Sequence, residues 1–248
     1  MNDQARVMIS HMFSLKDAGL LKVSGPDAFR FLQGQLTTDV AQLTENRCQL
    51  CAHCNREGRM ISLFHAFLYQ HDYYLLMPET LIPLAMAALK KYAIFFRVSF
   101  AIADAATIPM PTLPYPHLPS LHPETSGKFL PHEFNLHQTH AISFNKGCYT
   151  GQEIIARVHY RGKLKTGLYQ GILSCTLAPK PGSKVVYYEN QQYHVCGTIV
   201  ESQIQSHDQT SHLWMVCRHG HHLSHLLMKD GFQTLPIQLS LLETCVHV

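Results

Sequence analysis

The residue best suited to chemistry in this sequence is Cys148, which lies in the stretch K-G-C-Y-T-G-Q-E at residues 146–153. Thr150 and Glu153 have the S/T-x-x-E spacing of a capping box, and this spacing predicts that a helix begins at residue 151 or 152. The cation of Lys146 before the thiol and a helix N-terminus after it would both favour the thiolate. Gly147 and residue 151, also a glycine, permit turns with positive φ or close approach of another group. Cys148 is therefore the best candidate for a reactive thiol, although most loop cysteines are inert.

Two other groups of residues have the spacing of metal ligands. Cys48, Cys51 and Cys54 recur every three residues. On a strand, this spacing places Cys51 on the face opposite the other two, so the three thiols cannot converge on one ion. The stretch C-R-H-G-H at residues 217–221 places three potential ligands, one cysteine and two histidines, on one strand face, and such a geometry can hold Zn²⁺. A surface histidine cluster that binds metal adventitiously is the simpler interpretation, and we predict no metal site.

The composition excludes several classes of protein. The chain has 248 residues, of which 46% are hydrophobic and 15% charged, and its net charge is +3. These values are typical of a globular protein and give no electrostatic case for dedicated nucleic-acid binding. The first thirty residues contain no apolar run of the kind found in signal peptides, and no stretch approaches the length of a membrane span. We expect a cytoplasmic protein whose eight cysteines are reduced, with no membrane partner.

The elements that must position Cys148 belong to a mixed α and β pattern. Pro26 predicts the start of a helix whose face is formed by Phe29, Leu32 and Leu36, and Thr80 predicts the start of another over residues 81–92. Strands are expected at residues 20–23, 73–77 and 94–102, with a hairpin over 50–67 that turns at 55–59. This order predicts an α+β domain with mixed or antiparallel sheets.

The second half of the chain has a different pattern. Seven of the 13 prolines lie between Pro109 and Pro131, so this segment is expected to be extended or rich in turns. Short strands are then expected at residues 168–173, 184–188, 193–200, 213–217 and 235–241. Strands at this spacing predict a small barrel or sandwich.

The octapeptide at residues 146–153 resembles the K-G-C-[FY]-x-G-Q-E signature of the YgfZ family of folate-binding proteins, and it matches at every fixed position. A second motif, F-L-Q-G-Q-L-T-T-D-V at residues 31–40, resembles the other hallmark of that family. The family is related to the T-protein (aminomethyltransferase) of the glycine cleavage system. The resemblance implies a T-protein-like folate-binding domain at residues 1–162 and a small C-terminal β-barrel at 163–248.

The resemblance also implies a ligand and a role. The ligand would be tetrahydrofolate or another folate, and we assign its site to Lys146, Gln152, Glu153 and Arg157. Arg157 is placed to receive the glutamate tail of a folate, because guanidinium binds carboxylate in a bidentate manner. Cys148 would be the functional thiol. The implied role is support of iron–sulfur cluster assembly or repair and, indirectly, of tRNA modification, with iron–sulfur proteins or their assembly machinery as partners and no direct contact with nucleic acid.

Two alternatives remain open at this point. Family members carry a further α/β segment where this chain has its proline-rich stretch, and part of the folate cavity is built from flanking regions. The chain is therefore either a non-enzymatic folate protein or a partner-binding module whose folate cavity has decayed. The other alternative is a tetrahydrofolate-dependent aminomethyltransferase, which the octapeptide disfavours because the transferase lacks it.

Overall fold

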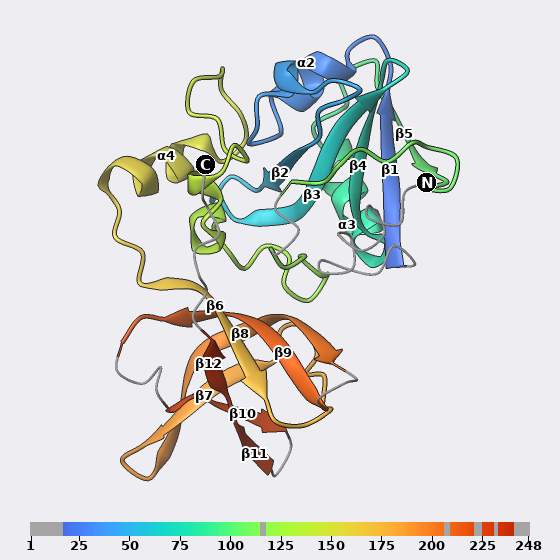
Figure 1. Cartoon of the computed structure of the whole chain (residues 1–248). Helices are drawn as coiled ribbons and strands as arrows, with labels where there is room; N and C mark the ends of the chain where they lie inside the picture. The colour runs from blue at the N-terminus through green and yellow to red at the C-terminus, as the bar shows by residue number, and fades with distance from the viewer. Residues whose placement is uncertain (1–16, 115–117, 206–208, 221–224, 231–232, 241–248) are drawn as a thin grey trace. The chain divides into compact units, whose positions relative to one another are not determined.

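The computed structural model describes residues 17–114, 118–205, 209–220, 225–230 and 233–240 (Figure 1). The chain divides into two compact units. The first unit extends to Gly162, apart from the short stretch His132–Asn135, which groups with the second unit from Lys163 onward. None of the helices in the described ranges is long and apolar enough to span a membrane.

A five-stranded sheet forms the centre of the first unit, with the strand order β2-β3-β4-β1-β5. All four pairings are antiparallel. The strands are β1 (Ala18–Ser24), β2 (Gln49–Cys54), β3 (Met60–Tyr69), β4 (Asp72–Pro78) and β5 (Ser99–Ala103). The predicted hairpin is confirmed as β2 and β3, which turn at residues 55–59 with Gly58 at φ 72°.

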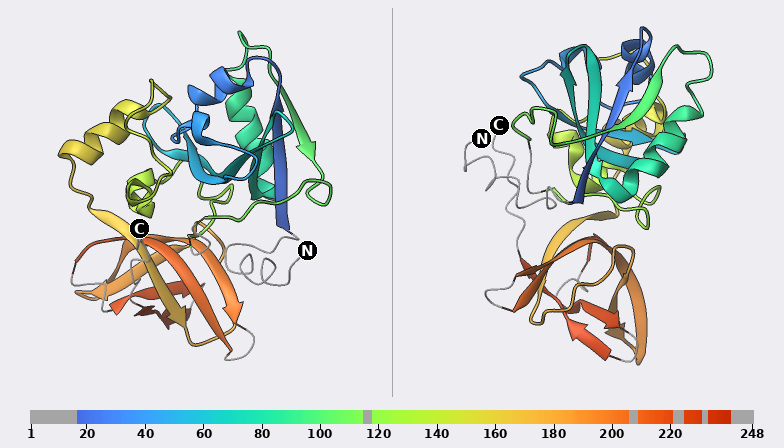
Figure 2. Two further views of the ribbon diagram at one scale, coloured as in Figure 1. Left: turned by 45° about the horizontal axis from the view of Figure 1, so that its top comes forward. Right: turned by 90° about the vertical axis from the view of Figure 1, so that its right-hand side faces the viewer.

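Helices cover one face of this sheet, and irregular chain covers the other (Figure 2). On the helical side, Phe31 of α2 packs edge-on against Phe100 of β5, with ring centroids 5.9 Å apart. The opposite face buries a cluster that includes Phe67 and Tyr74, and Ile108 and Met110 from the chain after β5 pack against it. The helices of this unit are α2 (Ala28–Gln33), α3 (Ile82–Lys90) and α4 (Gln152–Arg161), with 3₁₀ turns η3 (Val40–Gln42), η4 (Glu79–Leu81) and η6 (Leu136–Gln138).

Two of the expected helix starts are wrong. Pro26 lies in the turn before α2, which begins at Ala28 after the N-cap residue Asp27. The helix buries Ala28, Phe31 and Leu32, whereas Phe29 is 45% exposed. The expected face failed because α2 has only six residues and ends before Leu36, so that residue cannot help to define its face. Likewise, Thr80 lies within η4, and its side chain accepts no capping hydrogen bond from α3.

The strand expected at residues 94–102 forms only over its second half, as β5. Before it, the chain turns, and the amide of Phe96 donates a hydrogen bond to the carbonyl of Ala93 at 2.9 Å. The side chain of Phe96 packs on Phe31, with ring centroids 5.3 Å apart. The turn leaves Ile94 and Phe95 76% and 94% exposed, so the alternation in the sequence did not reflect a single strand.

The second unit is a small antiparallel barrel with the strand order β11-β10-β7-β8-β9-β6-β12. Only Ile237 separates β11 from β12. Because β11 pairs with β10 and β12 pairs with β6, this last stretch joins the two edges and closes the sheet. The strands are β6 (Thr166–Leu173), β7 (Lys184–Glu189), β8 (Gln192–Gln205), β9 (Thr210–Arg218), β10 (Leu227–Asp230), β11 (Gln233–Pro236) and β12 (Gln238–Ser240), and η5 (Pro131–Phe134) is a 3₁₀ turn.

The structure confirms the α+β class and the C-terminal barrel. Strand β10 was not expected, and the strand expected at residues 235–241 is divided between β11 and β12, with residue 241 outside the described part of the chain. His221 of the C-R-H-G-H stretch also lies outside it. His219 is described, and its Nδ1 lies 2.6 Å from the hydroxyl of Tyr169. In the described ranges, no three His, Cys, Asp or Glu side chains are grouped so that they could hold a metal ion.

Candidate functional site

Cys148 differs from the other cysteines in its exposure. Of the seven free cysteines that the structure describes, it alone is exposed. Cys48, Cys51 and Cys54 are buried on or beside β2. Burial raises the pKa of Cys48 to about 12 and raises the pKa values of Cys51 and Cys54 above the ordinary thiol value. These three thiols stay protonated at neutral pH and are inaccessible, which leaves Cys148 as the available sulfur of the first unit.

Helix α4 begins at Gln152, as predicted, but the predicted capping box does not form. The N-cap residue is Gly151, in a left-handed conformation with φ 84°, and no side chain caps the helix. The hydroxyl of Thr150 donates instead to Oε1 of Gln35 at 3.2 Å. The carboxylate of Glu153 accepts from Arg157 at 2.9 Å, so both members of the expected box are engaged elsewhere.

The two glycines of the octapeptide have different roles. A Cβ on Gly151 would lie 2.5 Å from the carbonyl oxygen of Asn55 and 3.0 Å from Cα of Gly58, both in the β2–β3 turn. A Cβ on Gly147 would meet nothing within 4 Å. Close approach of α4 to the hairpin therefore requires glycine at position 151, where the positive φ also favours it, and not at position 147.

The octapeptide and the second motif, far apart in the sequence, are joined by hydrogen bonds. The amide of Thr150 donates to the carbonyl of Gly34 at 3.1 Å. The ammonium of Lys146 donates to the carbonyls of Leu36 at 2.9 Å and Thr38 at 2.7 Å. With the Thr150–Gln35 bond, these contacts fix the loop that carries Cys148 against the chain that leaves α2.

The second motif is fixed in turn to β2. The amide of Thr37 donates to the carbonyl of Ala52 at 3.0 Å, and the amide of Ala52 donates to the hydroxyl of Thr37 at the same distance. The hydroxyl of Thr38 donates to Oε1 of Gln49. Thr37 and Thr38 are fully buried. These threonines therefore hold the second motif against the sheet and do not face solvent.

Lys146 is half-buried, and burial lowers its pKa to about 8. Its ammonium also lies 5.2 Å from the centroid of the Tyr149 ring, within the range of a cation–π contact. Near it, the pKa of Asp39 is lowered, chiefly because Nε2 of Gln33 donates to its carboxylate at 2.8 Å. The lysine cation is thus engaged by the second motif, and the arrangement gives it a positioning role.

Sequence reasoning missed two buried polar side chains beside this junction. The hydroxyl of Tyr149 and both ring nitrogens of His53 have no hydrogen-bond partner among the described residues. Burial lowers the pKa of His53 to about 4 and raises the pKa of Tyr149. The signature permits Phe in place of Tyr149, in keeping with a hydroxyl that makes no hydrogen bond. No pattern in the sequence distinguishes His53 from the many other histidines.

The remaining residues assigned to ligand binding lie on α4. Oε1 of Gln152 accepts a hydrogen bond from the amide of Tyr149 at 3.3 Å, so this side chain folds back onto the loop. Glu153 and Arg157 form an exposed ion pair, with side chains 83% and 66% exposed. The structure therefore places Cys148, Glu153 and Arg157 at the surface and turns Lys146 and Gln152 inward.

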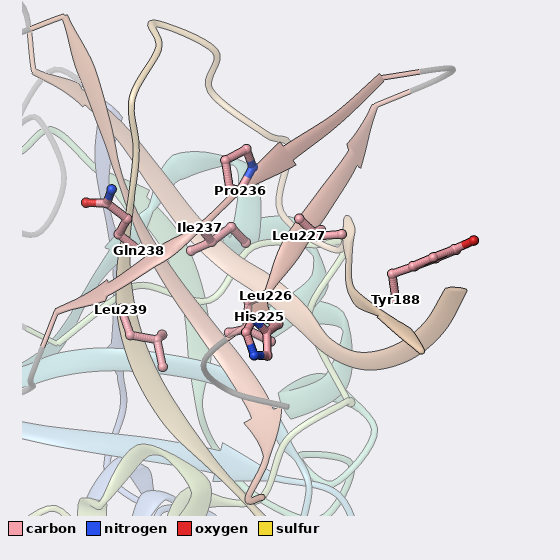
Figure 3. Close-up of a pocket in the computed structure, with 8 residues that line it drawn as sticks. All are labelled: Tyr188, His225, Leu226, Leu227, Pro236, Ile237, Gln238 and Leu239. Carbon is pink, nitrogen blue, oxygen red and sulfur yellow. The ribbon is translucent and has the colours of Figure 1, made fainter. Parts of the chain in front are cut away.

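Aromatic side chains adjoin the exposed side of α4. The ring of Phe144 stacks on His159 with centroids 4.0 Å apart, and Tyr160 lies edge-on to Phe144 at 6.0 Å. A cavity of about 690 Å³ is found elsewhere, within the second unit (Figure 3). It is lined by Tyr188, His225, Leu226, Leu227, Pro236, Ile237, Gln238 and Leu239.

Sequence comparison identifies the family. No family model matches the chain. An uncharacterized protein of Haemophilus influenzae is 30% identical over an alignment of 237 positions. The alignment covers 78% of this chain and 85% of the relative. The tRNA-modifying protein YgfZ of Pectobacterium carotovorum is 27% identical over an alignment of 267 positions, which covers 79% of this chain and 80% of the relative. The YgfZ protein of Buchnera aphidicola is 25% identical over an alignment of 295 positions, which covers 90% of this chain and 92% of the relative. The chain belongs to the YgfZ family.

Structural comparison supports the same relationship. The crystal structure of the glycine cleavage system aminomethyltransferase T from Bartonella henselae matches with a TM-score of 0.67 at 11% identity, covering 96% of this chain and 88% of the other. At this identity the match shows the fold alone, and it confirms that this YgfZ-family chain is T-protein-like. The alignment with the Buchnera protein is longer than this chain, so that relative contains positions that are absent here.

The two glycines give a matched pair of variants. Gly151→Ala should lower the free energy of unfolding by more than about 2 kcal/mol, because alanine pays about 1–2 kcal/mol for the left-handed conformation and its Cβ also meets the Asn55 carbonyl. Gly147→Ala should change it by less than about 0.5 kcal/mol. Urea denaturation measures both. Equal losses for the two variants would contradict the contact between α4 and the hairpin.

Stability should fall in acid because His53 is buried and has no hydrogen-bond partner among the residues that the structure describes. As pH falls, the unfolded chain takes up the proton near pH 6.5, whereas the folded protein takes it up only near pH 4. Stability is therefore complete above pH 6.5 and is lost progressively toward pH 4, by on the order of 3 kcal/mol. His53→Leu should reduce this loss, and His71→Asn, at an exposed turn, should not. Burial also lowers the pKa of His65 to about 4. The His53→Leu variant should therefore keep the part of the acid-dependent loss of stability that His65 causes.

Proposed function

We propose that this YgfZ-family chain is a cytoplasmic folate-binding protein that supports assembly or repair of iron–sulfur clusters. The observation that carries the proposal is the junction of the two family motifs, which holds Cys148 exposed at the start of α4. The curated relatives are called tRNA-modifying proteins. An effect on tRNA would follow indirectly, because the enzymes that thiolate tRNA carry iron–sulfur clusters.

The residues near Cys148 fit the anionic end of a folate. Arg157 is exposed and its partner Glu153 is more exposed still, so a glutamate-tail carboxylate can replace that side chain at little cost. Guanidinium binds such a carboxylate through two parallel hydrogen bonds. The rings of His159 and Tyr160, both exposed on α4, provide flat aromatic surface on the same helix. Lys146 and Gln152 serve the proposed site by holding its loop, since their polar atoms are engaged within the fold.

Cys148 would act as the functional thiol on the proposed client proteins. An exposed thiol can contact iron of a damaged or nascent cluster or exchange with a client disulfide. The three buried cysteines on or beside β2 cannot do so, because burial keeps them protonated and inaccessible. Among the described cysteines of the first unit, a single accessible sulfur suits a transient contact better than a resident cluster, which needs several ligands.

A transferase is the second candidate, because one solved structure with the same fold is an aminomethyltransferase. The octapeptide argues against this activity because the transferase lacks it. The stretch Met77-Pro78-Glu79-Thr80 is where an acidic residue that handles the folate nitrogen would be expected. Glu79 is exposed in η4, outside the junction. Methylene transfer from a glycine-derived aminomethyl carrier would favour the transferase.

A third candidate is a partner-binding module without a working folate site. Its support is the cavity within the second unit and the additional positions in a longer relative. Titration with tetrahydrofolate separates this candidate from the first, because only a folate protein produces saturable heat.

Calorimetric titration with tetrahydrofolate should show binding, and Arg157→Ala should weaken it about tenfold or more by removing a charge-assisted hydrogen bond. Arg161→Ala is the matched control, since Arg161 ends the same helix and forms no such ion pair with another residue that the structure describes. The affinity of the Arg161→Ala variant for tetrahydrofolate should remain within about twofold of that of the unaltered protein. Absence of saturable heat with the unaltered protein would favour the decayed cavity.

Cys148→Ala should abolish complementation of a strain that lacks its own YgfZ, while thermal unfolding stays unchanged because the side chain is exposed. Cys175→Ala, which removes a half-buried thiol of the second unit, should complement fully. Growth of the Cys148→Ala strain equal to that of the unaltered protein would refute the role of this thiol.

A further inference from the structure

Two thiols lie close together in the core of the second unit, and the proposed function uses neither of them. Cys196 of β8 and Cys217 of β9 belong to the hydrophobic core of the barrel, with exposed fractions of 3% and 0%. Strands β8 and β9 are neighbours in the sheet (Figure 1). Both cysteines are free, and a hydrogen bond joins their thiol groups. The barrel therefore encloses a dithiol.

A bulge in β8 directs the side chain of Cys196 into the core. The pairing of β8 with β7 passes from Gly197 to Val195 without a partner for Cys196, which is therefore the extra residue of the bulge. Consecutive residues of a regular strand face opposite sides of the sheet, and a bulge changes the direction of the side chain that it carries. Here Cys196 is in the core, and the adjacent Gly197 also faces the core thiol of Cys217.

Gly197 leaves the space that the sulfur of Cys217 occupies. These two residues are directly opposite each other in the β8–β9 pair, and a Cβ on Gly197 would overlap Sγ of Cys217. The sulfur therefore lies over the glycine, next to Cys196. Opposed Cα atoms of antiparallel strands are about 5 Å apart and consecutive Cα atoms about 3.8 Å, so Cα of Cys196 lies about 6 Å from Cα of Cys217. A disulfide can span this separation.

Another cysteine beside this core is too far away to compete. Cys175 packs against the same cluster, and its carbonyl accepts a hydrogen bond from the hydroxyl of Ser211 at 3.0 Å. Ser211 precedes Cys217 by six residues on β9, which is roughly 20 Å along the strand. Among the cysteines of this unit that the structure describes, Cys196 and Cys217 are therefore the two that can react with each other.

We propose that Cys196 and Cys217 form a reversible redox site, which hydrogen peroxide oxidises to a disulfide that links β8 to β9. In the first step, the thiolate of Cys196 attacks a peroxide oxygen, the O–O bond breaks and hydroxide leaves, so that the sulfur becomes a sulfenic acid. In the second step, the sulfur of Cys217 attacks this sulfur and the S–O bond breaks. The hydroxyl group takes the thiol proton and leaves as water. A thiol reductant restores both cysteines.

The order of the two steps follows from the surroundings of each thiol. The hydrogen bond with Cys217 lowers the pKa of Cys196, whereas this hydrogen bond and burial raise the pKa of Cys217. Cys196 also follows Val195, which is 54% exposed, so a molecule little larger than water reaches Cys196 before it reaches the completely buried Cys217. Cys217 then acts as the resolving thiol, and the disulfide prevents irreversible oxidation of Cys196.

Mass spectrometry tests the proposal on the full chain in a Cys148→Ala background, which removes the exposed thiol. The folded protein is treated with hydrogen peroxide, its remaining thiols are blocked in denaturant, and the digest is searched for linked peptides. The Cys196–Cys217 link should be at least about tenfold more abundant than any link to Cys175, and dithiothreitol should remove it. Peroxide treatment in urea should abolish this preference. Two free thiols after treatment, or the same mixture of links with and without urea, would overturn the proposal.

Single substitutions in the same background separate the two roles. In Cys217→Ser, the sulfenic acid on Cys196 has no thiol to react with, so dimedone should label Cys196 at least about tenfold more than when Cys217 is present. In Cys196→Ser, Cys217 should stay unlabelled. Cys175→Ser is the matched control and should form the Cys196–Cys217 link in full yield. Circular dichroism verifies that each variant is folded, and the linked peptide decides without them. Equal dimedone labelling of Cys196 with and without Cys217 would refute the resolving thiol.

Discussion

The ammonium of Lys146, held between the carbonyls of Leu36 and Thr38, is the contact on which the first unit depends. It joins two motifs that are more than a hundred residues apart in the sequence. The second motif is itself paired with β2 through Thr37, so the cation connects the Cys148 loop to the sheet in two steps. Because Lys146 is half-buried, each carbonyl bond carries more energy than the same bond would in water. An exposed thiol in a loop thereby gains a defined position.

Much of this unit follows from local sequence, and the rest does not. The hairpin was predictable because its determinant, a turn glycine, is local, whereas the start of α4 was placed correctly from a capping box that does not form. The capping box was wrong because Thr150 bonds to Gln35, 115 residues away, and no local pattern reveals this partner. The face of α2 and the length of β5 failed for a related reason. Hydrophobic periodicity identifies a buried face only while its residues share one regular element, and a six-residue helix or a turn at Phe96 breaks that condition.

The candidate site illustrates the same division. Cys148 and Arg157 could be chosen from the octapeptide and from helix position, and the structure leaves both at the surface. The inward orientation of Lys146 and Gln152 could not be predicted from the sequence, since the same side chains suit ligand binding and internal hydrogen bonding equally well. The burial of His53 could not be predicted, because a buried histidine is defined by what surrounds it. Sequence comparison places this chain in its family, the structural match shows its T-protein-like fold, and the junction joins its two motifs by hydrogen bonds.

Alkylation by iodoacetamide, followed residue by residue with mass spectrometry, tests most directly whether Lys146 fixes this junction. In the unaltered protein, Cys148 should react first, while Cys51, covered by the second motif and close to Lys146, stays unmodified. In Lys146→Met, which keeps the length of the side chain but removes its charge, Cys51 should become reactive while circular dichroism stays unchanged. An identical alkylation pattern in the two proteins would contradict the account, because the motifs would then be held together without this cation.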